Sequence, residues 1–245
     1  MTHRALTLAK TPNAYVLASI GVIVLFLLVM AIAVFIYSQD VMVRGQTLYK
    51  WLLREDGAVE KLTAIFLALA ALLSLIVAFR VSEALRWSRA FFLLLAAFST
   101  LMALEEISWG QRIFEVESSE FFQEHSDQKE INFHNVMQQY LERNGYAVTK
   151  TRKLAAIVLL AYGVVLPILN MFAPLRSIFR KFRLVVPPPA LMLGFFVGAL
   201  LAWYDRPTGR EEEIGELLFA MSFALLPPLW RLQQRHAADA PAIAS

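Results

Sequence analysis

Two adjacent glutamates are the residues of this sequence best suited to chemistry. Glu105 and Glu106 end an apolar run that begins at Ala90. They would stand at the C-terminal end of a helix, where the helix dipole opposes negative charge, and their carboxylates would repel each other. Such a pair requires a counter-charge, a shared proton or a metal ion. We therefore predict Glu105 and Glu106 to be catalytic, as metal ligands or as a general base.

Three further groups of acidic residues should lie on the same side as this pair, because each adjoins the matching end of an apolar run. These groups are Glu55, Asp56 and Glu60; Asp205; and Glu211, Glu212, Glu213 and Glu216. Glu60, Glu213 and Glu216 have a simpler interpretation as helix N-terminal charges, which the dipole stabilises. Of the 20 acidic residues, only Glu83 and Asp239 are expected on the other side.

The histidine best placed to join these carboxylates is His134, in the run Asn132–Asn135 (NFHN). A neutral imidazole with several carboxylates can hold a divalent metal ion, or can act as an acid/base set without one. We therefore predict His134 to be catalytic, with a divalent metal ion as the candidate cofactor. A lone loop histidine is more often structural or solvated, so that alternative stays open. The candidate metal ligands are Glu60, Glu106, His134 and Glu216.

Polar and aromatic residues beside these motifs are candidates for holding a substrate. Arg112 could bind an anionic headgroup. On a continued helix it would share a face with Glu105 and Trp109, so a structural Glu–Arg pair is the alternative. The predicted substrate-binding residues are Trp109, Gln111, Arg112, Asn132 and Asn135.

The composition is that of an integral membrane protein. Of the 245 residues, 58% are hydrophobic and 18% are charged, whereas a soluble domain is about 45–50% apolar and roughly a quarter charged. The chain has no cysteine, which excludes disulfides, thiol nucleophiles and cysteine-ligated metals. It has no Gly-rich phosphate loop, and its net charge of +3 gives no indication of nucleic-acid binding.

Six apolar runs predict an all-α, polytopic membrane protein, because about 20 helical residues cross the hydrocarbon core. One transmembrane domain should cover residues 1–235, followed by a disordered tail over 236–245. The third and sixth runs are short, so their helices should draw carboxylates below the membrane surface. The predicted helices are 14–37, 62–79, 89–108, 154–175, 184–204 and 213–230, with a long helical outer loop over 109–153.

Six crossings would place both termini on one side of the membrane. The short segment Arg176–Arg183 on that side carries four positive charges in eight residues. Short loops rich in arginine and lysine stay in the cytoplasm. We therefore predict a multi-pass protein of the cell (inner) membrane with cytoplasmic termini and an acidic outer face.

Small residues recur every four positions in the fifth apolar run. They give one smooth helix face along which another helix can approach closely. The partner would be a second copy of the chain, forming a homodimer, or a neighbouring helix of the same chain. The residues are Ala190, Gly194, Gly198 and Ala202.

Three runs of this sequence resemble a pattern that recurs in bacterial multi-pass membrane proteins of no established activity. They are Glu105–Phe114 (EEISWGQRIF), Asn132–Asn135 (NFHN) and Glu55–Glu60 (EDGAVE). The resemblance implies a membrane location and no particular reaction.

The paired glutamates also resemble a motif of the intramembrane CAAX-type proteases, and Phe121–His125 fits the Phe-x-x-x-His spacing of that family. That family has an arginine four residues after the second glutamate, where this chain has Gly110. Its histidine motifs also lie on membrane helices, whereas these residues lie in a polar loop.

These features favour a membrane-embedded hydrolase or transferase that acts on a lipid or lipid-linked substrate at the non-cytoplasmic face. One alternative is a non-catalytic scaffold whose outer loop binds a partner and whose acids pair with arginines. Another is a component of cation or proton transport. Against transport, the acids gather at one end of the helices and do not continue across the bilayer.

Overall fold

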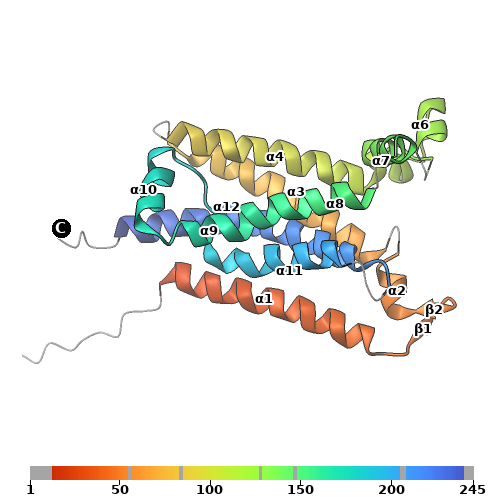
Figure 1. The fold of residues 1–245 in the computed structure, drawn as a ribbon, viewed down its shortest axis with the longest axis horizontal. Helices are drawn as coiled ribbons and strands as arrows, with labels where there is room; N and C mark the ends of the chain where they lie inside the picture. Colours follow the sequence, from red (N-terminus) through yellow and green to blue (C-terminus); the bar gives the residue numbers. More distant parts are fainter. Residues whose placement is uncertain are drawn as a thin grey trace, which may run out of the picture.

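Long apolar helices lie side by side in the computed structural model of the chain (Figure 1). Four of them are long and apolar enough to cross a membrane, which makes the chain a multi-pass membrane protein. They are α1 (Ala14–Tyr37), α3 (Ala58–Arg80), α4 (Arg86–Glu106) and α12 (Glu211–Asp239). The structure describes residues 13–54, 57–82, 85–126, 129–145, 148–204 and 208–239.

A fifth candidate span is a pair of helical segments with a sharp bend between them. The first segment, Lys153–Leu169, comprises most of α8 (Val148–Leu160), the π-helical turn η3 (Ala161–Val165) and α9 (Leu166–Leu169). Pro167 has no backbone N–H to donate one turn back, and π-helical turns often accompany such interruptions of the helical hydrogen-bond ladder. The next helix, α10 (Ala173–Lys181), is bent by 117° from this rod.

Helix α11 (Met192–Trp203) follows the short turn η4 (Pro189–Leu191) and is apolar, but it is shorter than the other candidate spans. It lies alongside α1 and α12 in Figure 1. The described part of the chain therefore supports four to five membrane spans by length and composition.

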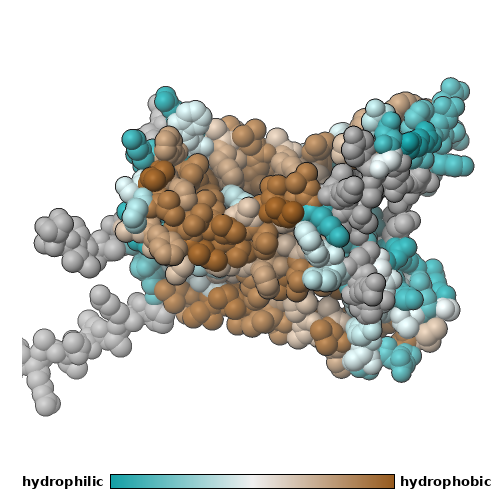
Figure 2. All heavy atoms as spheres, viewed as in Figure 1, coloured by the Kyte–Doolittle hydropathy of each residue, from teal (hydrophilic) through white to brown (hydrophobic). Residues whose placement is uncertain are grey.

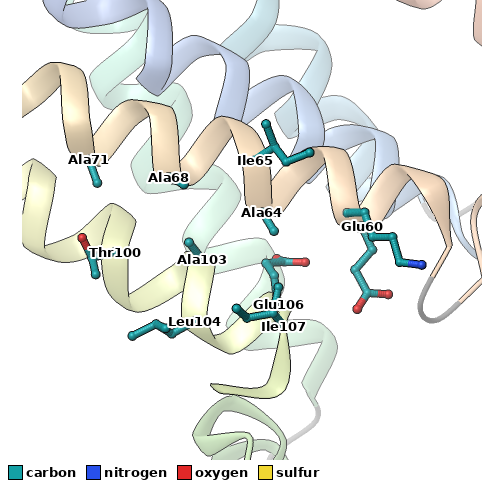
Figure 3. A pocket seen from close by; sticks show the side chains of 11 residues that line it. Glu60, Ala64, Ile65, Ala68, Ala71, Thr100, Ala103, Leu104, Glu106 and Ile107 are labelled. Atoms are coloured by element: carbon teal, nitrogen blue, oxygen red, sulfur yellow. The ribbon is translucent and has the colours of Figure 1, made fainter. Parts of the chain in front are cut away.

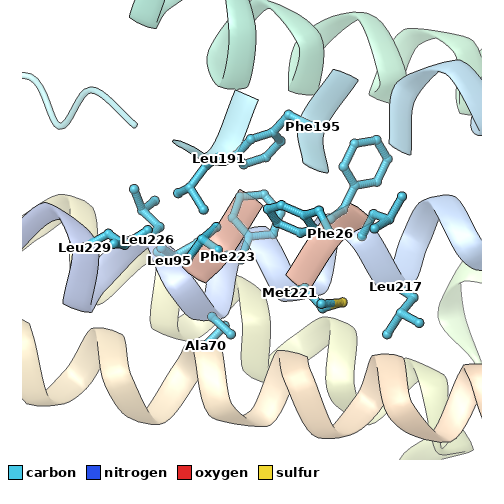
Figure 4. Packing of buried hydrophobic residues seen from close by; sticks show 14 of the residues in the cluster. Phe26, Ala70, Leu95, Leu191, Phe195, Leu217, Met221, Phe223, Leu226 and Leu229 are labelled. Carbon is cyan, nitrogen blue, oxygen red and sulfur yellow. The ribbon is translucent and has the colours of Figure 1, made fainter. Parts of the chain in front are cut away.

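Helix α12 is the centre of the bundle. It packs against α3, α11 and α1, while α4 packs against α3, and α8 packs against α11. Leu218 and Leu226 of α12 are fully buried, and Phe26 of α1 and Phe195 of α11 pack into the same cluster (Figure 4). In a membrane, close packing of this kind holds helices together, because lipid tails are as apolar as the side chains.

The outside of the bundle is apolar in the middle and polar at both ends. Figure 2 shows this apolar band along the face in view. Large apolar side chains such as Phe79, Leu94 and Phe35 are 80%, 71% and 64% exposed. An apolar surface of this extent would be a liability in water, and it matches the hydrocarbon of a bilayer.

The stripe of small residues on α11 contacts other helices of the same chain. A Cβ atom added at Gly194 would lie 2.4 Å from Ser222 Oγ of α12 and 2.5 Å from Phe26 Cζ of α1. A Cβ atom at Gly198 would lie 2.8 Å from the ring of Phe219. Ala190 and Ala202 are buried as well. Packing within the chain therefore explains the stripe, and a homodimer through it stays a prediction.

Only the predicted helix 14–37 has the observed bounds, and the other five differ in extent. Helix α3 extends from Ala58 to Arg80, α4 begins at Arg86 and ends at Glu106, the predicted helix 154–175 is divided between α8–α9 and α10, and α11 begins only at Met192. Helix α12 extends from Glu211 to Asp239, into the segment predicted as a disordered tail. At 1.5 Å per residue, the 29 residues of α12 are longer than a bilayer core. The length of α12 therefore does not fix the depth of its glutamates. Residues 240–245 of the predicted tail lie outside the described residues.

Short elements lie at one end of the bundle, and side-chain contacts connect two helices at the other. The hairpin of β1 (Met42–Val43) and β2 (Gln46–Thr47) leads into α2 (Leu48–Leu52). At the other end, the Asn13 side-chain amide lies 2.7 Å from His236 Nδ1, and Tyr15 stacks on the His236 ring. These contacts join the start of α1 to the end of α12.

Between α4 and α8 the chain forms short helices instead of an open loop. They are η2 (Ser108–Gly110), α5 (Gln111–Phe114), α6 (Glu120–His125) and α7 (Phe133–Arg143). Helix α7 ends at Arg143, and Gly145 just beyond it has a positive φ of 79°, which is common where a helix stops.

Candidate functional site

Four carboxylates from three helices come together at the end of the bundle opposite the termini. Glu60 lies in the first turn of α3, Glu106 is the last residue of α4, and Glu213 and Glu216 lie in the first turns of α12. The charges that act most strongly on Glu106 are those of Glu216, Glu213 and Glu60. We call these four residues the acidic cluster. Because like charges repel at close range, a cation or a cationic group would be stabilised beside it.

Glu105 belongs to a different environment from its neighbour Glu106. Its side chain is only 7% exposed and accepts a hydrogen bond of 2.7 Å from Trp109 Nε1. Its backbone carbonyl oxygen accepts a bond from the Asn132 side chain at 3.2 Å. Glu105 therefore connects the segment between α4 and α8 to the end of α4, whereas Glu106 faces α3 and α12.

A left-handed turn separates α4 from the segment that follows. Ser108, Trp109 and Gly110 have φ angles of 45°, 55° and 76°. This conformation costs a non-glycine residue about 1–2 kcal/mol. Contacts at the first two positions hold it in place, since Ser108 Oγ donates to Glu130 at 2.6 Å and Trp109 donates to Glu105.

The left-handed turn also corrects the predicted position of Arg112. The helix does not continue through Trp109, so the shared helix face of Glu105, Trp109 and Arg112 is absent. The side chain of Arg112 itself lies outside the described residues.

Gln111 connects distant parts of the segment between α4 and α8. Its Nε2 donates to Ser118 Oγ at 2.7 Å, and its Oε1 accepts from the backbone N–H of Ile131 at 2.7 Å. Ser118 Oγ in turn donates to the carbonyl oxygen of Lys129 at 2.7 Å. Both ends of the amide are thus engaged within the protein, so Gln111 has a structural role in this conformation, and substrate binding by it stays a prediction.

The predicted histidine site is defined only by its backbone. The side chains of His134 and Asn135 lie outside the described residues, while their backbone forms part of the first turn of α7. Asn132, two residues before His134, contacts Glu105, and Phe133 meets Trp109 edge-on at 5.7 Å. The start of α7 is therefore fixed against the end of α4.

Phe121 and His125, the pair that fits the protease spacing, lie on α6. The Nδ1 atom of His125 lies 3.0 Å from the carbonyl oxygen of Phe121, and the two rings stack at 4.9 Å. These contacts stay within one short helix of the segment between α4 and α8. They do not connect His125 to the acidic cluster.

A metal site with the predicted ligands is not formed by the side chains that the structure describes. Among them, no three histidine, aspartate or glutamate side chains are arranged to hold a metal ion. The set of Glu60, Glu106 and Glu216 with His134 stays a prediction, because it depends on the imidazole of His134.

A groove between α3 and α4 opens beside the acidic cluster, as Figure 3 shows. Its volume is about 890 Å³. Glu60, Lys61 and Glu106 lie at its polar end, and small side chains such as Ala68 and Ala103 line its length. It extends along α3 as far as Ala71 and along α4 as far as Thr100. The 11 helical steps from Glu60 to Ala71 correspond to about 16 Å of helix.

Comparison with models of protein families, with curated proteins and with solved structures gives no match. The chemistry of the site must therefore be argued from its own geometry.

Sequence reasoning identified Glu60 and Glu106 at the polar end of this groove but missed the small residues along its length. The signal was present, because alanines recur at Ala64, Ala68 and Ala71 on α3 and oppose Thr100 and Ala103 on α4. Small residues usually let two helices pack closely. Here α3 and α4 do pack against each other, and the same small side chains also leave an open groove between the two helices.

Glu211 was grouped by sequence with the other acidic residues of the predicted site, but its contacts in the structure are those of a structural residue. It is 3% exposed and accepts hydrogen bonds from Thr208, Gly209 and Arg210 at 2.7–3.3 Å, which caps the start of α12. It also bonds to the hydroxyl of Tyr49 in α2. Glu211 thus ties the start of α12 to the segment between α1 and α3.

Proposed function

We propose that this protein is a hydrolase or transferase embedded in the membrane, acting on a lipid or lipid-linked substrate at the non-cytoplasmic face. The observation that carries this proposal is the groove between α3 and α4, which is apolar along its length and ends at Glu60 and Glu106. An acyl or prenyl chain in the groove would hold the polar part of a lipid beside the acidic cluster. Ligand sites are commonly apolar clefts with a few polar groups at one place.

In this proposal, Glu106 exchanges a proton with the reacting group or with an attacking water molecule. A carboxylate in a partly dehydrated site can act as a general acid or base. Glu60 and Glu216 would position water or a cation beside it. His134 would be the acid/base partner or a metal ligand, and Arg112, Trp109 and Asn135 would contact the polar part of the substrate.

The proposed topology has six crossings, with α8–α9 and α11 as the fourth and fifth. The termini would then be cytoplasmic and the acidic cluster would lie on the opposite side of the cell (inner) membrane. Support comes from the basic residues at the end with the termini, since positive charge is retained in the cytoplasm.

The distribution of acids favours an enzyme over a transport component. On α3, α4 and α12 the glutamates all lie near one end, and along the groove below Glu60 and Glu106 the lining is alanine, isoleucine, leucine and threonine. A proton or cation pathway usually continues through paired ionisable groups.

The groove is tested by filling it. Ala68→Phe and Ala103→Phe place a ring in the space, and Leu101→Phe is the matched control, because Leu101 is 48% exposed on the same α4 and does not line the groove. Each protein is purified in mild detergent, and the lipids that remain bound are identified by mass spectrometry. The expected result is one lipid class bound to the wild type and the control, and lost from both groove variants.

The reaction is tested in nanodiscs made from a total lipid extract of the host membrane. Lipid composition is followed over time with the wild type and with Glu106→Gln. A lipid consumed by the wild type and left intact by Glu106→Gln supports the proposal. A groove that retains lipid while no lipid is consumed under any condition, with and without added divalent metal, would favour the scaffold alternative.

A further inference from the structure

The charged side chains that the structure describes at the end of the bundle with the termini are all basic, since all of them are lysines and arginines. These residues are Arg80, Arg86, Arg89, Arg176, Arg180, Lys181, Arg183, Arg231 and Arg235. The opposite end carries acidic and basic side chains together. The two ends therefore present different surfaces to the headgroups of the two leaflets.

Helix α10 lies at this basic end and crosses the bundle. The 117° bend after α9 turns it away from the direction of the long helices, as Figure 1 shows. A helix that lies in the plane of a membrane surface is likewise steeply inclined to the helices that cross the membrane.

The two faces of α10 differ in chemistry. On a helical wheel, four apolar side chains spaced three or four residues apart make one face, and three basic side chains with a serine make the other. Ile178 and Phe182 on the apolar side are 47% and 61% exposed, so the protein itself covers them only in part. The apolar positions are Leu175, Ile178, Phe179 and Phe182, and the polar positions are Arg176, Ser177, Arg180 and Lys181.

We propose that α10 is an interfacial helix that binds anionic lipid headgroups in the leaflet on the side of the termini. Its apolar face would enter the boundary between headgroups and acyl chains, and its basic face would meet the phosphates. Arg176 also supports the bend, because its Nε and Nη2 atoms donate to the carbonyl oxygens of Asn170 and Met171 at 2.9 Å. Arg180 and Lys181 are exposed and are the residues to vary.

The depth of α10 is tested with spin labels, which the absence of cysteine makes straightforward. Single variants Ile178→Cys and Ser177→Cys carry a nitroxide in vesicles of phosphatidylcholine with phosphatidylglycerol. The label at 178 should collide more with oxygen, which concentrates in lipid, and the label at 177 more with a water-soluble nickel chelate. Two labels that are equally accessible to the nickel chelate would overturn the interfacial position.

The charge preference is tested by titrating the purified protein with phosphatidylglycerol or phosphatidylcholine and counting bound lipids by native mass spectrometry. The variant Arg180→Gln/Lys181→Gln should bind phosphatidylglycerol on the order of tenfold more weakly than the wild type. The control Lys50→Gln/Lys129→Gln removes two exposed positive charges from the opposite end and should be unchanged.

Two outcomes would overturn the lipid proposal. One is equal binding of the two lipids by the wild type. The other is displacement of phosphatidylglycerol by millimolar inorganic phosphate, which would show that the basic face binds free phosphate and has no preference for a lipid.

Discussion

Trp109 Nε1 donates a hydrogen bond of 2.7 Å to the carboxylate of Glu105, four residues earlier in the chain, across a turn in which the helix has already ended. The carboxylate of Glu105 is engaged by this bond and does not belong to the acidic cluster. Glu106 is the member of the pair that faces Glu60, Glu213 and Glu216. The two glutamates should therefore respond differently to the same substitution.

Glu105→Ala should lower the stability of the protein. The change removes the acceptor of the Trp109 indole N–H at a site that is 7% exposed, which costs about 1–3 kcal/mol. Glu105→Gln keeps an acceptor oxygen and should lose less. Thermal unfolding in detergent, followed by circular dichroism, measures both variants. Equal losses in the two variants would mean that the hydrogen bond does not contribute.

Glu106→Gln should leave the unfolding temperature unchanged or raise it, because it replaces one of four neighbouring carboxyl groups, which repel one another when ionised, with a neutral amide. The same substitution should abolish lipid turnover if the proposed function is correct. The control is Glu105→Gln measured in the same assays. A clear fall in unfolding temperature for Glu106→Gln would contradict the idea that the acidic cluster is kept at a cost in stability.

Gly194→Ala should destabilise the bundle, because the added methyl group would lie 2.4 Å from Ser222 Oγ and 2.5 Å from Phe26 Cζ. Overpacking of this kind costs about 1–3 kcal/mol. Gly21→Ala on α1 is the matched control, since nothing lies within 4 Å of its added Cβ. Unfolding temperature and oligomeric state are measured for both variants. A change in oligomeric state without a change in stability would show that the stripe forms a dimer interface instead.

Tyr49→Phe should reduce stability at neutral pH and not at strongly alkaline pH. Burial and the neighbouring Glu211 carboxylate raise the pKa of Tyr49 above its ordinary value of about 10. The folded protein therefore keeps this hydroxyl protonated at a pH where the unfolded chain has lost the proton. The stabilisation is fully present below pH 10 and is lost as the pH rises above it.

The measurement for Tyr49 is the unfolding temperature of wild type and Tyr49→Phe between pH 8 and pH 11. The wild type should be the more stable by about 1.5–3 kcal/mol at pH 8, the range for a hydrogen bond to a charged group. The difference should shrink above pH 10. A difference that is constant across this range would show that the hydroxyl does not bond to Glu211 in the folded protein.

The helices were predictable from the sequence because an apolar run of membrane-spanning length has few other structures available. Their ends were harder to predict. Helix α4 stops at Glu106 since Ser108 and Trp109 adopt left-handed angles, which neither residue type favours on its own. The hydrogen bonds to Glu130 and Glu105 that hold this turn join residues up to 22 positions apart.

The candidate site was predicted in part. Helix order places Glu60, Glu106 and Glu216 at the same level of the bundle, because they lie at matching ends of neighbouring helices. Sequence alone did not separate Glu105 from Glu106, since adjacent residues on a helix differ by about 100° in direction and the facing helices were unknown. The groove depends on the spacing between α3 and α4, which no local pattern specifies.

Helix α12 has a consequence for how the protein is made. It is the most enclosed of the four long candidate spans, because 78% of the residues in its apolar 18-residue stretch are buried. It is also synthesised after every helix that it contacts. Until it enters the membrane, α3 can pair with α4 and α11 can pair with α1 and α8, but the surface that joins α3 to α1 and α11 is absent. Completion of the bundle is therefore expected to be a post-insertion event triggered by the last helix.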